Sequence, residues 1–146
     1  MSDPKPHRLP VRVYPVRVYY EDTDAGGIVY HANYLKYAER ARTELLRDAG
    51  FDHTSLMADH GAGFAVRRCT LEFIKPAVLD DALVIETDVA SLRGASVEMR
   101  QCIRRGDQTI AQVDIHVALI DRHGRPMRLP PALAAAMRGL SAPAEA

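Results

Sequence analysis

The chain has 146 residues, 47% of them hydrophobic, and its 19 basic and 19 acidic residues give a formal net charge of zero. This composition is typical of a globular domain and excludes a disordered chain. The absence of a basic excess argues against a general nucleic-acid-binding protein, and no apolar run approaches the ~20 residues of a transmembrane segment.

The first ten residues, M-S-D-P-K-P-H-R-L-P, contain no apolar core after their charges. We therefore interpret residues 1–10 as a flexible arm rather than a secretion signal. Two cysteines, Cys69 and Cys102, lie in strand-like runs without metal-ligand spacing. Without a signal, we expect free thiols and a cytoplasmic location.

A strand is predicted to lead into the first loop. Val16, Val18 and Tyr20 alternate with polar residues, and Pro15 indicates a break or a sheet edge before them. The segment 21–29 then contains the glycine pair Gly26-Gly27, which permits a close approach of the backbone to a ligand.

A long helix follows, starting somewhere in Tyr30 to Asn33 and ending at Gly50, a typical C-terminal stop. Its apolar residues recur every three or four positions, as on one helix face: Tyr34, Tyr37 or Ala38, Ala41 and Leu45.

The rest of the chain reads as a short helix and then strands. Residues 51–60 favour a helix capped by Asp52. Four strands joined by short turns follow, at 64–74, 82–91, 95–105 and 109–121. A short helix is predicted at 131–138, and a disordered tail at 141–146.

These elements predict an α+β architecture in a single domain spanning residues 11–140. Consecutive strands with short connections form an antiparallel sheet, and only one long helix is available to cover its apolar face. We therefore expect an antiparallel β-sheet wrapped around one long central helix. The remaining exposed edge or back face favours a symmetric dimer at least.

The most informative stretch for function is Tyr20 to Tyr34, which reads Y-E-D-T-D-A-G-G-I-V-Y-H-A-N-Y. It places Asp24 beside the start of a helix, where backbone N–H groups lack partners and carry the positive end of the helix dipole. Such groups can hold a developing oxyanion while the carboxylate attacks a carbonyl or activates water. An aspartate in a glycine-containing loop also commonly forms a turn or a cap. We interpret this stretch as an acyl-transfer site, with nucleophile and general base both open for Asp24.

The motif D-T-D-A-G-G-I-V-Y-H-A-N-Y at the helix entry resembles the hotdog-fold acyl-CoA thioesterases. The match is closest to the Tol–Pal-associated group, which is related to 4-hydroxybenzoyl-CoA thioesterase. It runs from Val16 to about Gly50 and continues more loosely through 64–77, 93–98 and the last strand. The resemblance implies the hotdog fold and hydrolysis of acyl-CoA to a free acid and CoA, without metal or cofactor.

By the same resemblance, Asp24 is the catalytic carboxylate, and the backbone N–H of His31 polarises the thioester carbonyl. The His31 imidazole is a second candidate group for orienting water or the carbonyl. The family places its active sites at a dimer interface, with CoA partly bound by the neighbouring subunit. Its dimers often pair into tetramers, so a homodimer or a homotetramer is implied.

Further residues are candidates for substrate binding. Tyr30 and Tyr34 are either packing residues or the lining of an acyl pocket, and Phe64 is expected to shape that pocket. The turn containing Arg93, Gly94 and Ser96 is either a solvated turn or a contact to CoA.

The other polar motifs are less informative about function. Asp22 is expected to hold the loop through backbone N–H groups. A calcium loop counted from Asp22 would need glutamate at its twelfth position, where Asn33 stands. The remaining histidines lack metal-ligand spacing, and no G-x-S-x-G motif points to a serine hydrolase. No metal site is therefore expected.

Two rival functions remain on the same fold. A hydroxyacyl dehydratase would need a histidine and an acid at positions where this chain lacks them. A non-catalytic module that binds acyl-CoA or acyl carrier protein, or that acts as a cell-envelope scaffold, would bind without releasing thiol. The acyl group, and CoA versus acyl carrier protein as its carrier, stay open.

Overall fold

The computed structural model describes residues 12–140; the arm predicted at residues 1–10 and the tail at 141–146 lie outside this range. Five strands form one antiparallel sheet: β1 (Arg12–Arg17), β2 (Gly63–Phe73), β3 (Ala82–Arg93), β4 (Ser96–Arg105) and β5 (Gln108–Ile120). Their spatial order is β1-β3-β4-β5-β2, which places β1 and β2 at opposite edges.

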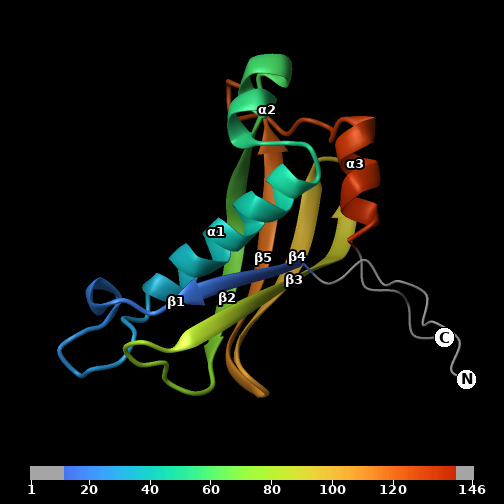
Figure 1. Cartoon of the computed structure of the whole chain (residues 1–146). Coiled ribbons are helices and arrows are strands. Elements are labelled where there is room, and N and C mark those ends of the chain that lie inside the picture. The colour runs from blue at the N-terminus through green and yellow to red at the C-terminus, as the bar shows by residue number, and fades with distance from the viewer. Residues whose placement is uncertain (1–11, 141–146) are drawn as a thin grey trace, which may run out of the picture.

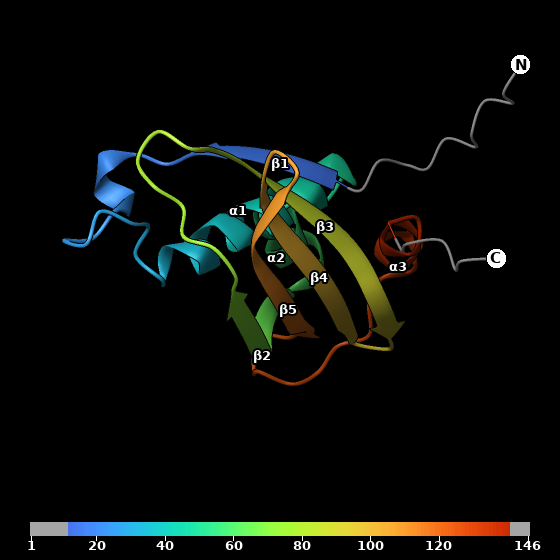
Figure 2. The ribbon, with the colours of Figure 1, turned by 90° about the horizontal axis from the view of Figure 1, so that it is seen from below.

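The sheet curves around the long helix α1 (Asn33–Asp48), as Figures 1 and 2 show. The apolar face predicted for this helix is buried against the sheet and comprises Tyr34, Tyr37, Ala38, Ala41 and Leu45. The last strand, predicted at 109–121, corresponds to β5, and alternate residues along it, Val113, Ile115 and Val117, are buried. The hotdog architecture expected from the sequence is therefore confirmed.

Two smaller helices follow later in the chain. The helix α2 (His53–His60) is capped as predicted, since the Asp52 carboxylate accepts a hydrogen bond of 2.7 Å from the Ser55 N–H. The helix α3 (Pro131–Arg138) spans the predicted residues. Figure 1 shows α2 and α3 at the end of the molecule where α1 terminates.

The first predicted strand is wrong in its position. β1 spans Arg12–Arg17, so it includes Pro15 and ends before Tyr20. The proline is tolerated because β1 is an edge strand, where a missing N–H removes no hydrogen bond from the sheet interior. Tyr20 begins the 3-10 helix η1 (Tyr20–Asp22) and is 82% exposed. The Asp22 carboxylate accepts a hydrogen bond of 2.8 Å from the Tyr19 N–H, and this short-range contact bends the chain out of the extended form.

Candidate active site

Asp22 fixes both ends of the loop between η1 and α1. Its carboxylate holds the Tyr19 N–H, and its carbonyl oxygen accepts hydrogen bonds of 2.8 Å from the Tyr30 N–H and the Asn33 side-chain amide. Asn33 is the first residue of α1 and is almost fully buried. Asp22 therefore has the loop-holding role expected from the sequence.

Asp24 lies at the tip of this loop in a tight turn. Its Oδ1 accepts a hydrogen bond of 2.8 Å from the Gly26 N–H, and its carbonyl oxygen accepts one of 3.0 Å from the Gly27 N–H. Gly27 has a φ of +81°, a conformation that glycine adopts without strain. Among the described residues, Oδ2 of Asp24 has no hydrogen-bond partner, so one carboxylate oxygen is available to a ligand.

The start of α1 presents free backbone donors. The N-cap residue is Ala32, which has no side chain able to cap the helix. The Asn33 N–H reaches the Tyr30 carbonyl at 2.8 Å, whereas the N–H groups of His31 and Ala32 find no acceptor within residues 12–140. Because the helix dipole is positive at this end, these N–H groups can hold a negatively charged oxygen.

Asp24 and His31 line the same open pocket, which has a volume of about 410 Å³. Its other walls come from the loop, from α1, from the end of β2 and from the segment that follows it: Ile28, Val29, Tyr34, Phe73, Ile74, Lys75 and Pro76. The fold thus brings together the two groups that the sequence paired for acyl transfer. The mostly apolar wall leaves room for an acyl chain beside them.

Aromatic rings shape this pocket. Tyr34 is buried, and its ring centre lies 5.7 Å from that of Phe73 in an edge-on contact. Its hydroxyl oxygen accepts a hydrogen bond of 3.2 Å from the Ala77 N–H. Burial raises the pKa of Tyr34, so the hydroxyl stays protonated at neutral pH. Tyr30 is half exposed, and its ring centre lies 4.5 Å from that of the His31 imidazole. Tyr30 itself, a predicted substrate-binding residue, does not line this pocket.

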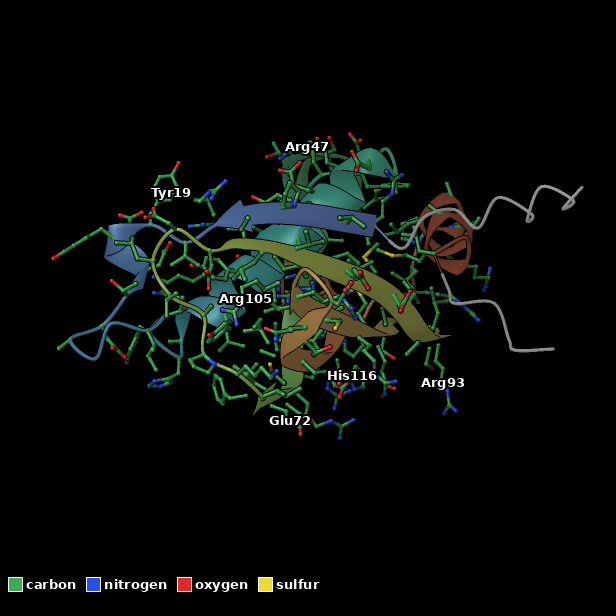
Figure 3. All side chains as sticks on the ribbon, turned by 60° about the horizontal axis from the view of Figure 1, so that its bottom comes forward. Tyr19, Arg47, Glu72, Arg93, Arg105 and His116 are labelled. Carbon is green, nitrogen blue, oxygen red and sulfur yellow. The ribbon has the colours of Figure 1, made fainter. Side chains whose placement is uncertain are left out.

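The other predicted substrate-binding residues lie elsewhere in the chain. Phe64 lines a separate cavity beside the second half of α1. Arg93, Gly94 and Ser96 form the turn between β3 and β4, where Ser96 Oγ donates a hydrogen bond to the Arg93 carbonyl at 3.2 Å. Figure 3 shows Arg93 at the opposite end of the molecule from Tyr19. One chain alone therefore does not bring this turn to Asp24.

The sequence analysis did not predict that the end of β2 and the segment after it form part of the Asp24 pocket. Phe73, Ile74 and Lys75 line the Asp24 pocket because Ile28 bridges to Val78 as an isolated antiparallel pair. This pairing links residues far apart in the sequence. The available signal was the apolar Phe73-Ile74 pair placed directly before Lys75-Pro76, which is unusual at an exposed strand end. Lys75 adds a cationic residue to the lining of this pocket.

Three further observations concern the described residues. Cys69 and Cys102 are both free thiols, as expected. Within residues 12–140, no three His, Cys, Asp or Glu side chains are grouped closely enough to hold a metal ion. None of the helices in that range is sufficiently long and apolar to cross a membrane.

Comparisons with known proteins place this geometry in a family. The family described as the thioesterase-like superfamily matches residues 18–137. The acyl-CoA thioester hydrolase YbgC of Escherichia coli is 46% identical over 119 residues, which cover 81% of this chain and 85% of YbgC. The acyl-CoA thioesterase YbgC of Haemophilus influenzae is 43% identical over 108 residues, covering 74% and 79% of the two chains.

A solved structure agrees with these relatives. The probable thioesterase from Bartonella henselae is 41% identical, with a TM-score of 0.77, and the match covers 81% of this chain and 98% of that one. Residues 18–137, which the family model matches, include the Asp24 loop, α1 and the strands β2 to β5. The chain therefore belongs to the thioesterase-like superfamily of hotdog proteins and, within it, to the YbgC acyl-CoA thioesterase family.

Proposed function

We propose that this protein hydrolyses acyl-CoA thioesters to a free carboxylic acid and CoA, with Asp24 and the start of α1 as the reacting site. One observation carries the proposal: Asp24 and His31 line the same pocket, and the His31 N–H has no acceptor within residues 12–140. Membership of the YbgC family supports the reaction, because the relatives named above are acyl-CoA thioester hydrolases.

The reaction follows from the charges that develop during thioester cleavage. The carbonyl oxygen gains negative charge as the tetrahedral intermediate forms, and the His31 N–H at the positive end of α1 stabilises it. Asp24 either attacks the carbonyl carbon or takes a proton from the attacking water. The C–S bond then breaks, and its electron pair leaves on sulfur, which takes up a proton. Where Asp24 is the nucleophile, water then hydrolyses the acyl–Asp24 anhydride, which releases the free acid and restores the carboxylate. In either role Asp24 acts through one carboxylate oxygen, which lies against the carbonyl carbon when it is the nucleophile and against the attacking water when it is the general base. Among the described residues, Oδ2 accepts no hydrogen bond and can take this position.

Lys75 has a role in the last step of this scheme. Lys75 is one of the residues that line the pocket of Asp24. An ammonium group stabilises a nearby thiolate by charge and can return a proton to it. We therefore assign Lys75 to the leaving sulfur, and Asp24 with the His31 N–H to the carbonyl.

The role of the His31 side chain can be tested separately from that of its backbone N–H. Its ring lies 6.4 Å from Phe73 in an edge-on contact, so the imidazole also forms part of the pocket wall. A role for the imidazole in orienting water requires His31→Ala to slow the reaction. A purely backbone role leaves the rate in that variant largely intact, since the N–H remains.

The complete site is proposed to need a second copy of the chain. β2 is an edge strand that pairs only with β5 among the described residues, and its free edge carries the exposed side chains Val66 and Phe73. Two copies of β2 pairing antiparallel about a two-fold axis would place Phe64 of one chain near Phe73 of the other. A homodimer, or a homotetramer built from it, would in this way bring Phe64 and the turn containing Arg93, Gly94 and Ser96 to a neighbouring substrate. A cytoplasmic location, where acyl-CoA or acyl carrier protein would be met, belongs to the same proposal.

A panel of acyl-CoAs followed with a thiol-reactive dye tests the function. Thiol release that depends on enzyme and saturates with substrate is the expected result. Tight binding of acyl-CoA with no thiol release would instead favour a binding or scaffold module. Hydration of crotonyl-CoA without thiol release would favour the dehydratase.

A further inference from the structure

Asn33 is one of three buried polar side chains within residues 12–140, together with Thr87 and Gln101. Only 7% of its surface is exposed, although it is the first residue of α1 and asparagine is a residue type that usually faces solvent. A buried amide is costly unless it is hydrogen-bonded. The partners of this side chain therefore indicate its role.

The two groups of the proposed reaction belong to one short hairpin. The Tyr30 N–H donates a hydrogen bond of 2.8 Å to the Asp22 carbonyl at its base. Nearer the tip, the Asp24 N–H donates one of 2.9 Å to the Ile28 carbonyl. Asp24 thus lies on the first arm, and His31 directly follows the second. Figure 1 shows this hairpin at the start of α1, away from α2 and α3.

Asn33 closes the base of the hairpin on both arms. Its Nδ2 donates a hydrogen bond of 2.8 Å to the Asp22 carbonyl, the oxygen that also accepts the Tyr30 N–H. Its backbone N–H donates one of 2.8 Å to the Tyr30 carbonyl. His31 and Ala32 lie inside the turn that this second bond closes. The side chain of Asn33 therefore holds the first arm, and its backbone holds the second.

Capping of α1 would be the common role of an asparagine near a helix start, but the Asn33 amide does not have it. A capping side chain accepts a hydrogen bond from an N–H of its own helix. Nδ2 of Asn33 instead donates to a residue eleven positions earlier in the chain. The N-cap is Ala32, and no side chain caps the helix. The amide thus fixes the loop and leaves the N–H groups of the helix start to a ligand.

We infer that Asn33 is a positioning residue of the proposed reaction, which sets the Asp24 carboxylate against the His31 N–H. The group that acts at a carbonyl carbon and the donor that holds its oxygen must keep a fixed separation. A misplacement of about 1 Å costs on the order of 100-fold in rate. The kinetic part of this inference rests on the proposed function, whereas the hydrogen bonds it uses exist without turnover.

The test uses two variants of Asn33 across a range of pH. Asn33→Asp keeps the shape of the side chain but has no donor while its carboxyl is ionised. At pH 8 its kcat for acyl-CoA should be about 10–100-fold below that of the wild type, with KM little changed. As the pH falls, the carboxyl regains a proton that it can donate, so the ratio of this kcat to the wild-type kcat should rise.

Asn33→Ala cannot regain a donor, so its kcat should stay low relative to the wild type at every pH. This variant separates the lost hydrogen bond from the added charge of Asn33→Asp. A wild-type kcat in either variant at pH 8 would overturn the inference. A kcat ratio for Asn33→Asp that stays flat or falls in acid would also overturn it.

Thr87→Val is the matched control for the loss of a buried hydrogen bond. Thr87 lies on β3, is 1% exposed, and accepts a hydrogen bond of 3.1 Å from Gln101 Nε2 through its Oγ1. Valine has a similar shape without the hydroxyl, so this variant should melt at a lower temperature with an unchanged kcat. If kcat falls equally in Thr87→Val and Asn33→Ala, Asn33 acts only through the stability of the fold, and the inference is wrong.

Amide hydrogen exchange followed by NMR separates this inference from the proposed function. In Asn33→Ala the Tyr30 N–H should exchange at least ~10-fold faster than in the wild type, because the base of the hairpin has lost one of its bonds. The Val113 N–H of β5 serves as the reference and should change less. If the wild type releases no thiol but the Tyr30 N–H is accelerated, the proposed function fails and the hold of Asn33 on the hairpin stands. An unchanged Tyr30 N–H would overturn the inference whatever the activity.

Discussion

The hydroxyl of Tyr34 accepts a hydrogen bond from the backbone N–H of Ala77 at 3.2 Å and so ties the first turn of α1 to the segment after β2. The Ala77 carbonyl in turn accepts a hydrogen bond of 2.9 Å from the Val29 N–H. Three segments that line the Asp24 pocket are therefore joined at one buried point. This junction holds the pocket walls at a fixed distance from the carboxylate.

Tyr34→Phe should weaken this junction. The Ala77 N–H would be left buried without an acceptor, which costs about 1–3 kcal/mol of unfolding free energy. Tyr37→Phe is the matched control, because the Tyr37 hydroxyl is buried and has no hydrogen-bond partner within residues 12–140. Burial raises the pKa of Tyr37, and the Asp22 carboxylate adds to this shift. Urea unfolding should show a loss for Tyr34→Phe and no loss for Tyr37→Phe. Equal losses would mean that the Ala77 contact does not stabilise the fold.

The glycine pair after Asp24 offers a test of carboxylate position. A Cβ added at Gly26 would lie 3.1 Å from Asp24 Oδ1, so Gly26→Ala should push the carboxylate aside. We expect kcat/KM for acyl-CoA to fall at least ~10-fold, because small displacements of a reacting group are costly. The melting temperature should change little.

Gly27→Ala provides the comparison. A Cβ there meets nothing within 4 Å, but the φ of +81° is strained for alanine and costs about 1 kcal/mol. This variant should lose more stability and less activity than Gly26→Ala. The opposite ranking in steady-state kinetics and thermal melting would show that the position of the Asp24 carboxylate is not critical.

The role proposed for Lys75 predicts a dependence on the leaving thiol. Lys75→Met should slow the hydrolysis of acyl-CoA by about 10–100-fold, because an alkyl thiolate then leaves without a neighbouring cation. Thioesters of aromatic thiols, which are more acidic, should be slowed much less. Lys36→Met, an exposed lysine of α1 that does not line the pocket, is the control. The same slowing for both kinds of thioester would exclude the proposed stabilisation of the leaving sulfur.

Asp81 links the segment after β2 to the sheet and predicts a pH dependence of stability. Its carboxylate accepts hydrogen bonds of 2.6 Å from Arg105 and 2.9 Å from the Val78 N–H. Burial alone raises the pKa of Asp81, but these hydrogen bonds outweigh it and hold the pKa below its ordinary value of 3.8. A lowered folded-state pKa stabilises the protein above the ordinary value, and this stabilisation is lost as the pH falls through the lowered one.

Asp81→Asn should therefore be less stable than the wild type by about 1–3 kcal/mol above about pH 4, with a difference that shrinks toward pH 2. Asp52 and Asp121 also have lowered pKa values, but they are present in both proteins and cancel in the comparison. Urea unfolding across this pH range measures the difference. A difference that stays constant or grows in acid would rule out this linkage. Asp107→Asn, in the exposed β4–β5 turn, should show no such trend.

Local patterns predicted much of the fold. The alternation along β5 and the proline at the start of α3 are short-range signals, and both elements appear where they were predicted. β1 was misplaced because Pro15 reads as a break in sequence but is tolerated at an edge, which is a tertiary property. The turn at Tyr20 depends on one contact between Tyr19 and Asp22, which no hydrophobic period encodes.

The site was predictable to the extent that it is contiguous. Asp24 and His31 are close in sequence and line one pocket. Lys75 was not predicted as a site residue. The segment that contains it reaches the Asp24 pocket through the pairing of Ile28 with Val78, which are far apart in the sequence. Phe64 and Arg93 were grouped with Asp24 from sequence, whereas one chain holds them apart, and only a second copy would reunite them.

The most direct measurement is the turnover of acyl-CoA by Asp24→Asn. Asparagine keeps the oxygen that accepts the Gly26 N–H, so the turn, the fold and the substrate affinity should be retained. Removing the carboxylate charge should lower kcat by about 10³-fold or more, with an unchanged melting temperature. A folded Asp24→Asn variant that releases thiol at the wild-type rate would contradict the proposed mechanism.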